Sequence, residues 1–195
     1  MRRKITVFVF LISLIVAQAA SAVTFKVDPD HTTVEFRVRH VFSYVKGTFD
    51  QFDGMFDYDA DHPETWKAKG LIQAASINTR VVQRDNHLRS KDFFEVEKFP
   101  IIDFKTTDIT DVTPKGSKVH GVLTIRGIAK PVVLDVAVHG VAKDPWGNVR
   151  AGLTATTTIN RKDFGLTWNQ VLETGQLLVG EEVEITVEVE GIAQK

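Results

Sequence analysis

The chain has 195 residues, no cysteine and nearly balanced charge, with 24 lysine and arginine residues against 25 aspartate and glutamate residues. This balance excludes the strongly basic surface typical of nucleic-acid-binding proteins, so we expect no nucleic-acid partner. The absence of cysteine excludes disulfides, thiolate metal sites and a lipid anchor attached at a cysteine. The length is sufficient for one domain that buries a substantial apolar core.

The first 22 residues have the pattern of a secretory signal peptide. Basic residues occupy positions 2–4, an apolar run covers 5–16, and the small residues Ala-Ser-Ala stand at 20–22. The apolar run is shorter than the roughly 20 residues that a membrane-spanning helix needs, so we expect no stable membrane insertion. The sequence therefore predicts a signal peptide over 1–22 and a single exported domain over 23–195. That domain has 21 basic and 25 acidic residues, a formal charge of −4.

Most of the remaining chain alternates between apolar and polar residues, which is typical of β-strands with one buried face. Val34, Phe36 and Val38, for example, alternate with polar or charged neighbours. Turn signals such as Asp53-Gly54 separate the alternating segments. The predicted strands cover 24–27, 33–41, 44–52, 55–59, 67–76, 101–110, 118–126, 132–141, 151–159 and 182–191.

Some of these ten segments are expected to merge, which leaves about eight antiparallel strands in an all-β domain. Long strands with short connections favour a lipocalin-like barrel over a sandwich. A closed barrel has no exposed sheet edge, and one of this size can hold a small ligand. Nine inward-facing apolar residues are predicted to contact such a ligand: Phe36, Val38, Phe49, Phe52, Ile72, Phe104, Leu123, Leu134 and Ile159. The small residues Ala68, Gly70 and Gly121 share strand faces with them and are expected to leave room.

The segment 78–99 interrupts the strand pattern. It predicts a helical crossover over one end of the barrel, with Asn78 or Thr79 as the helix cap. Its basic residues are spaced by four, three and four positions and so share one helix face: Arg80, Arg84, His87 and Lys91. This stripe is either a cationic collar that binds the polar head of an amphiphile or a solvated helix face balanced by nearby acidic residues. Residue types alone do not decide between the two.

Catalytic and metal-binding interpretations have less support. Asp85, His87 and Ser90 are the residue types of a hydrolytic triad, but residues two apart on a helix point about 200° away from each other. Asp85 is therefore not expected to orient His87. The six histidines show no compact ligand spacing. We expect no catalytic residue, metal or cofactor, with a metal- or cofactor-dependent periplasmic enzyme as the alternative.

Short blocks along the chain resemble the YceI-like family of periplasmic polyisoprenoid-binding proteins. These blocks are DPDHT at 28–32, GTF at 47–49, FDG at 52–54, SINT at 76–79, RDNHLRS at 84–90, DFF at 92–94, GVLTIRG at 121–127, KPV at 130–132, DPWG at 144–147 and RAG at 150–152. A further block, RKDFGL at 161–166, is similar but precedes a stretch, 168–172, that varies among relatives. The resemblance extends over essentially the whole chain after the signal pattern.

The resemblance implies a lipocalin-like barrel that holds a long-chain isoprenoid or similar amphiphilic lipid, in the periplasm and without catalysis. It implies binding or transport as the function, and it is compatible with both a monomer and a homodimer. A small outer-membrane barrel is a further alternative, in which apolar residues would face outward. Glu182, Glu184, Glu188 and Glu190 would then crowd a narrow lumen, which disfavours that alternative.

Overall fold

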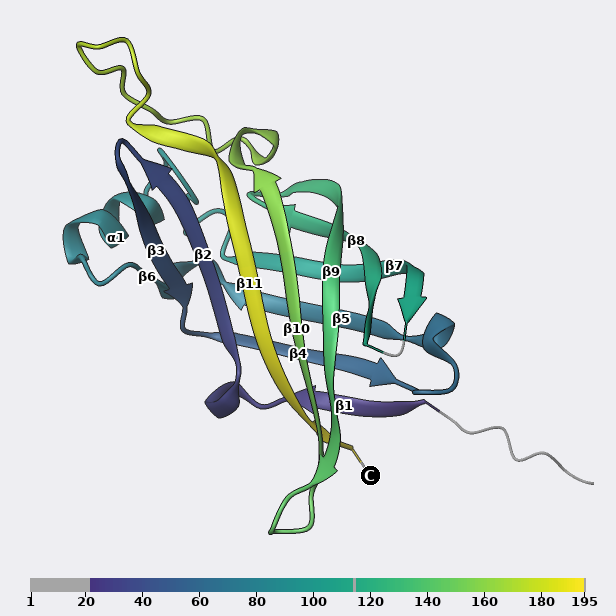
Figure 1. Cartoon of the computed structure of the whole chain (residues 1–195). Helices are drawn as coiled ribbons and strands as arrows, with labels where there is room; N and C mark the ends of the chain where they lie inside the picture. The colour runs from purple at the N-terminus through teal and green to yellow at the C-terminus, as the bar shows by residue number, and fades with distance from the viewer. Residues whose placement is uncertain (1–21, 114, 195) are drawn as a thin grey trace, which may run out of the picture.

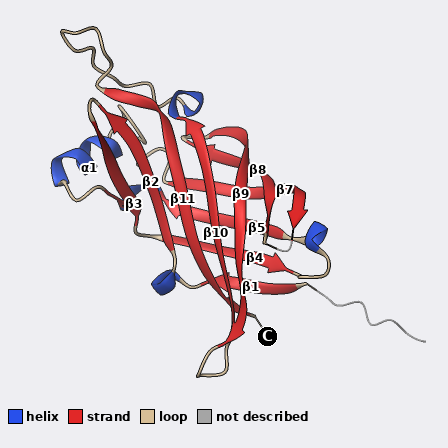
Figure 2. Cartoon of the chain, in the orientation of Figure 1, coloured by secondary structure: helices blue, strands red, loops and turns tan. Residues whose placement is uncertain are grey.

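The computed structural model describes residues 22–113 and 115–194, and its strands form a closed antiparallel barrel (Figure 1). Figure 2 shows that strands dominate and that the helices are short. Eight strands form the ring in the order β1, β4, β5, β7, β8, β9, β10 and β11, and pairing of β1 with β11 closes it. The strands are β1 (Val23–Val27), β2 (Thr33–His40), β3 (Ser43–Phe49), β4 (Phe52–Tyr58), β5 (Lys67–Gln73), β6 (Ile77–Asn78), β7 (Ile101–Thr113), β8 (Gly116–Ile125), β9 (Ile128–Lys143), β10 (Val149–Asn160) and β11 (Val179–Ala193). The predicted eight-stranded barrel is confirmed.

Three positions of the barrel are each occupied by two strand segments with a break between them. β2 continues β1 along the same edge of β11, after a short 3-10 turn at Pro29–His31. β3 and β4 are separated by two residues, so the predicted strand 44–52 is split. β5 ends at Gln73 because the chain turns at Ala74–Ser76, which shortens the predicted strand 67–76. β6 then pairs with β3 and extends the sheet beyond the closed ring.

Alternation along the strands places apolar side chains inside the barrel and charged ones outside. Every second residue of β8 is buried. On the outer surface Arg37 and Glu184 are register partners and form an ion pair at 2.6 Å. Lys118 and Asp135 form a similar pair at 2.7 Å. This orientation is the reverse of the apolar exterior that an outer-membrane barrel requires.

Two aromatic rings inside the barrel pack directly on glycines of the neighbouring strand. A Cβ at Gly47 would lie 2.5 Å from the ring of Phe36, and one at Gly121 would lie 2.3 Å from the ring of Phe104. Both positions need glycine, because any side chain would overlap the ring. The prediction of free space at Gly121 is therefore wrong, because the ring of Phe104 fills that space.

The segment 78–99 crosses one end of the barrel, as predicted, but its helix is shorter than expected. Helix α1 (Val82–Arg89) lies beside β3 and β6 (Figure 1). Asn78 belongs to β6, and its Oδ1 accepts a hydrogen bond from the Arg80 main-chain N–H at 2.9 Å instead of capping the helix. Arg80 has a positive φ of 64°, which keeps it out of the helix. Among the described residues, no helix is long and apolar enough to cross a membrane.

Two groups of buried side chains form the core. The larger group includes Phe49, Ile77 and Phe93 and packs beneath the helical crossover. The smaller group centres on Phe25 and Phe56, whose rings stack with centroids 5.2 Å apart. Members of both groups also border an internal cavity, so the barrel is hollow between its packed regions.

Candidate functional site: the barrel cavity

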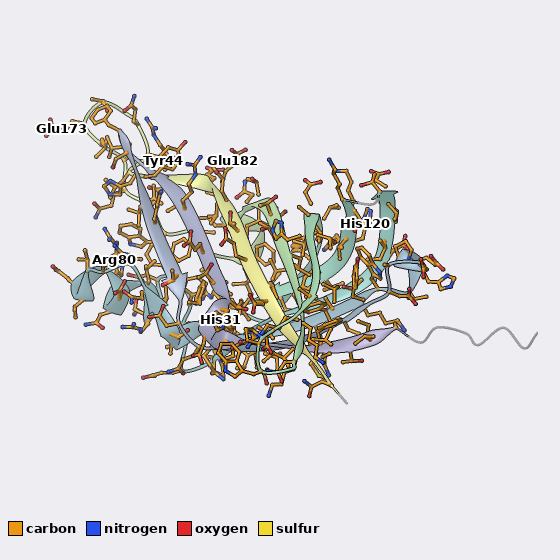
Figure 3. The ribbon with its side chains drawn as sticks, turned by 60° about the horizontal axis from the view of Figure 1, so that its bottom comes forward. His31, Tyr44, Arg80, His120, Glu173 and Glu182 are labelled. Carbon is orange, nitrogen blue, oxygen red and sulfur yellow. The ribbon has the colours of Figure 1, made fainter. Side chains whose placement is uncertain are left out.

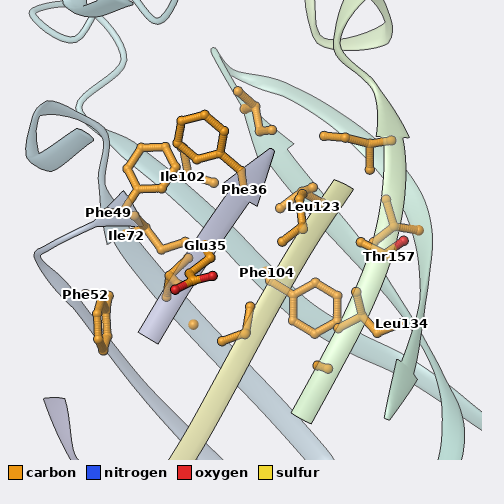
Figure 4. A pocket seen from close by; sticks show the side chains of 18 of the residues that line it. Glu35, Phe36, Phe49, Phe52, Ile72, Ile102, Phe104, Leu123, Leu134 and Thr157 are labelled. Carbon is orange, nitrogen blue, oxygen red and sulfur yellow. The ribbon is translucent and has the colours of Figure 1, made fainter. Parts of the chain in front are cut away.

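The barrel encloses a cavity of about 700 Å³ with mainly apolar walls. Figure 4 shows aromatic and aliphatic side chains, among them Phe36, Phe104 and Leu134, around this space. The volume falls within the range of roughly 300–1,000 Å³ that is usual for small-molecule sites. At about 30 Å³ per carbon group, the volume of one water in the liquid, the cavity has room for roughly 20 groups. Four isoprene units have this size.

All eleven residues that the sequence predicts for the site line the cavity. Phe49, Leu123 and Ile159 are buried, with 8%, 9% and 9% of their surface exposed. The other six apolar residues are only half-buried, although alternation points them inward: Phe36, Val38, Phe52, Ile72, Phe104 and Leu134. These six side chains retain exposed surface because they face the open volume of the cavity and are not covered by other side chains. Their contact with a ligand stays a prediction.

The cavity wall has unfilled space at Gly70. It lies on the inward face of β5 between Ala68 and Ile72, and all three border the cavity. A Cβ at Gly70 would meet no atom within 4 Å. In contrast to Gly121, this glycine leaves room that no neighbouring side chain fills, as the sequence predicts.

Arg84 borders the cavity from α1, but Arg80 and Lys91 do not. Arg80 is exposed on the outside of the molecule (Figure 3). The Nε of Arg84 donates to Thr79 Oγ1 at 2.7 Å, and its Nη2 donates to the Thr79 carbonyl at 2.8 Å. Thr79 in turn donates from Oγ1 and from its main-chain N–H to the buried carboxylate of Asp85, at 2.5 and 2.9 Å. The predicted four-residue stripe is therefore not one continuous helix face, and Arg84 anchors the loop before α1.

His87 is the second predicted polar residue at the cavity. Its Nε2 lies 3.0 Å from the Asp92 carboxylate. Its ring packs edge-on against Phe93 and Trp168, with centroid distances of 5.1 and 4.8 Å. Ser90 donates from Oγ to the His87 carbonyl at 2.7 Å. The His87 ring is thus packed between two aromatic rings and has one acidic neighbour, Asp92. Asp85 does not contact His87 as the acid of a catalytic triad would.

One group of potential metal ligands lies outside the cavity. Atoms of Asp28, His31 and Glu190 are within 4.8 Å of one another. The guanidinium of Arg150 donates to Asp28 at 2.7 Å, to Glu190 at 2.6 Å and to Asp144 at 2.9 Å. The hydrogen bond from Arg150, followed by that from His31, lowers the pKa of Asp28. Because a fixed cation already bonds two of the three candidate ligands, the cluster is an ion-pair network and a poor fit for a metal ion.

Two residues that the sequence did not single out also border the cavity near α1. Trp168 packs against His87 and Phe93, with its centroid 5.3 Å from the ring of Phe93. Arg161 opens the 3-10 helix Arg161–Phe164 after β10 and is only 3% exposed. Burial lowers the pKa of its guanidinium. An arginine after a strand is usually solvent-exposed, so residue type gave no signal that this one turns inward.

Comparisons with known proteins identify the family of this barrel. The YceI-like domain matches residues 25–191. A UPF0312 protein from Pseudomonas putida is 36% identical over 186 residues, which are 94% of this chain and 93% of the relative.

Two solved structures have a similar fold. BcnA from Burkholderia cenocepacia superposes with a TM-score of 0.75 at 21% identity, over 84% of this chain and 98% of BcnA. A domain from Saccharophagus degradans, described as polyisoprenoid binding and implicated in plant cell wall breakdown, superposes with a TM-score of 0.65 at 15% identity. That match covers 90% of this chain and 100% of the domain. The family match spans both the ring and the crossover helix that border the cavity, and the chain belongs to the YceI-like domain family.

Proposed function

We propose that the protein binds and carries a long-chain isoprenoid or similar amphiphilic lipid inside the barrel, without catalysing a reaction. The observation that supports this function most directly is the apolar cavity of about 700 Å³ with unfilled space at Gly70. The described ligand class of the Saccharophagus degradans domain, which shares the fold, supports the choice of an isoprenoid.

The energetics favour a hydrocarbon tail as the main source of affinity. Burying one isoprene unit of five carbons contributes roughly 4 kcal/mol, at about 0.8 kcal/mol per carbon group, before ordering costs are subtracted. A tail of about four units therefore binds tightly with few polar contacts. In this proposal the nine predicted apolar residues contact the tail, and Arg84 and His87 flank the end of the cavity beneath α1.

The periplasm is the proposed location. The signal-peptide pattern over 1–22 supports it. Residues 1–21 lie outside the described part of the structure, so the pattern rests on sequence alone. An exported carrier would shield the hydrocarbon chain from water between the sites that release and receive it.

Native mass spectrometry of protein prepared without detergent tests the proposal. We expect a mass increase that corresponds to one amphiphile, which organic extraction removes and which can be identified after extraction. Protein unfolded in denaturant, stripped of lipid and refolded is the control, and it should regain the mass increase when a C20 polyprenol is added. Repeated preparations that contain no lipid and also fail to bind added polyprenols would overturn the proposal.

A further inference from the structure

A buried arginine at the end of the cavity has a hydrogen-bonding group without a partner. Arg161 lies in the 3-10 turn Arg161–Phe164, which follows β10. Figure 1 shows this turn next to the tip of the β10 arrow. Its Nε donates to the Gly180 carbonyl at 2.8 Å, and its Nη1 donates to the carbonyls of Leu166 and Trp168. Its Nη2 is buried and has no hydrogen-bond partner within the described part of the chain.

The charge of Arg161 is only partly offset, by the carboxylate of Glu181, which acts on it without a direct ion pair. The ion pairs found among residues 22–113 and 115–194 do not include Arg161. Glu181, the nearest acidic residue in sequence on β11, pairs with Lys162 instead. A guanidinium stays protonated in proteins, so loss of the proton cannot remove the energetic cost of burying its charge. A buried cation without a directly bonded counter-ion is unfavourable, and buried charges are normally paired.

The position of this guanidinium connects it to the cavity. Arg161, Leu166 and Trp168 all border the cavity. Trp168 supplies both a carbonyl that accepts from Arg161 and an indole ring that packs on His87. The end of the cavity near Trp168 is therefore bordered by a fixed cation, and the Nη2 of this cation has no hydrogen-bond acceptor among the described residues.

We propose that Arg161 binds the oxyanion head group, a carboxylate or a phosphate, of the amphiphile whose tail fills the barrel. This inference rests on the proposed function and adds the orientation of the ligand, with its head at Arg161 and its tail running into the barrel. Arg84 is less suited to this role. Its Nε and Nη2 are already bonded to Thr79, and it is less buried than Arg161.

Three probes with the same C20 tail separate the contribution of the head from that of the tail: geranylgeraniol, geranylgeranoic acid and geranylgeranyl monophosphate. Their dissociation constants are measured at neutral pH on the lipid-free protein. A charge-assisted hydrogen bond in a buried site predicts that the wild-type protein binds at least one anionic probe on the order of ten- to hundredfold more tightly than the alcohol. Comparison of the acid with the phosphate shows which oxyanion the site prefers.

The variant Arg161→Gln loses the hydrogen bonds to Gly180, Leu166 and Trp168 together with the head contact, but it keeps the side chains that surround the tail. It should therefore lose most of this preference and bind geranylgeraniol within about threefold of the wild type. Arg161→Lys, which keeps the charge, should retain part of the preference. Arg89→Gln is the matched control, since Arg89 also donates to two main-chain carbonyls, of Ala75 and Ile77, but does not border the cavity. It should leave the preference unchanged.

Several results would overturn the inference. Equal affinity of the wild-type protein for all three probes would show that no anion site exists, while the carrier function would stand. This measurement uses the wild-type protein alone, so it does not depend on whether a variant folds. Loss of the preference in Arg84→Gln but not in Arg161→Gln would assign the head group to Arg84. Failure to bind any of the three probes would overturn the proposed function and this inference together.

Discussion

Filling the empty space at Gly70 should shorten the longest tail that the barrel accepts. A Cβ at this position meets no atom within 4 Å, and the residue does not have the positive φ that would require glycine. The substitution Gly70→Phe therefore directs a ring into the cavity from a Cβ that meets no neighbouring atom. We expect the variant to fold as stably as the wild type but to hold less lipid.

The size of the effect follows from the cavity volume. A phenylalanine side chain adds seven carbons, roughly 200 Å³ at about 30 Å³ per group, to a cavity of about 700 Å³. This removes the space of at least one isoprene unit. Expelling one unit of a C20 tail forfeits roughly 4 kcal/mol of apolar burial, and even a third of that loss weakens binding about tenfold. A C15 tail still fits, so its affinity should change little.

Tryptophan fluorescence can measure both affinities. Trp66 and Trp168 border the cavity, and replacing the exposed Trp146 by phenylalanine removes background signal. Gly152→Phe is the matched control, because Gly152 is also a strand glycine, a Cβ there would make only an ordinary contact with His139 Cβ at 3.7 Å, and the residue does not border the cavity. If Gly70→Phe binds geranylgeraniol as tightly as the wild type and Gly152→Phe do, the cavity is not where the tail binds.

Three further predictions concern the scaffold. Gly121→Ala should lower the free energy of unfolding by about 1–3 kcal/mol, measured by urea unfolding, because its Cβ would overlap the ring of Phe104. Arg150→Met should lower the melting temperature more at pH 7 than at pH 3. The carboxylates around Arg150 have lowered pKa values in the folded state, so they stabilise the fold above about pH 4 and lose that effect as the pH falls. Arg84→Ala should cost about 1–3 kcal/mol of unfolding free energy through its two lost hydrogen bonds to Thr79.

Each of these three predictions would be contradicted by a specific result. A Gly121→Ala variant as stable as Gly70→Ala would show that the ring of Phe104 can move away without loss. The same melting-temperature difference at pH 7 and pH 3 for Arg150→Met would mean that the ionised carboxylates do not act through this arginine. An Arg84→Ala variant with unchanged stability but weakened binding of anionic lipids would support a ligand-binding collar over a structural role.

The inward-facing residues could be predicted because strand periodicity assigns a side chain to one face or the other. Val38, Phe52 and Leu134 belong to strands that are distant in the sequence, yet each borders the same cavity. Closure of the barrel brings them together, and closure was expected from strand number and length. The open space at Gly70 followed from the same face assignment, whereas Gly121 shows that a neighbouring ring can occupy such space.

The features that could not be predicted depend on contacts between distant segments. β6 exists because Ile77 and Asn78 pair with the end of β3, and this pairing delays the start of α1 beyond Thr79. Arg161 is buried because carbonyls as far away as Gly180 accept its hydrogen bonds. Neither contact has a signature in local composition or spacing, so the sequence predicted a helix cap at Asn78 or Thr79 and gave no prediction that Arg161 is buried.

The claim that the hollow barrel holds a lipid tail is tested most directly by locating such a tail inside it. Crystals of the lipid-free protein incubated with a terminally brominated C20 alcohol would show the bromine by its anomalous scattering. We predict one bromine site per chain within the barrel, surrounded by inward-facing residues such as Phe104 and Leu134. Bromine found only on the outer surface, with the interior closed around collapsed side chains, would contradict the account.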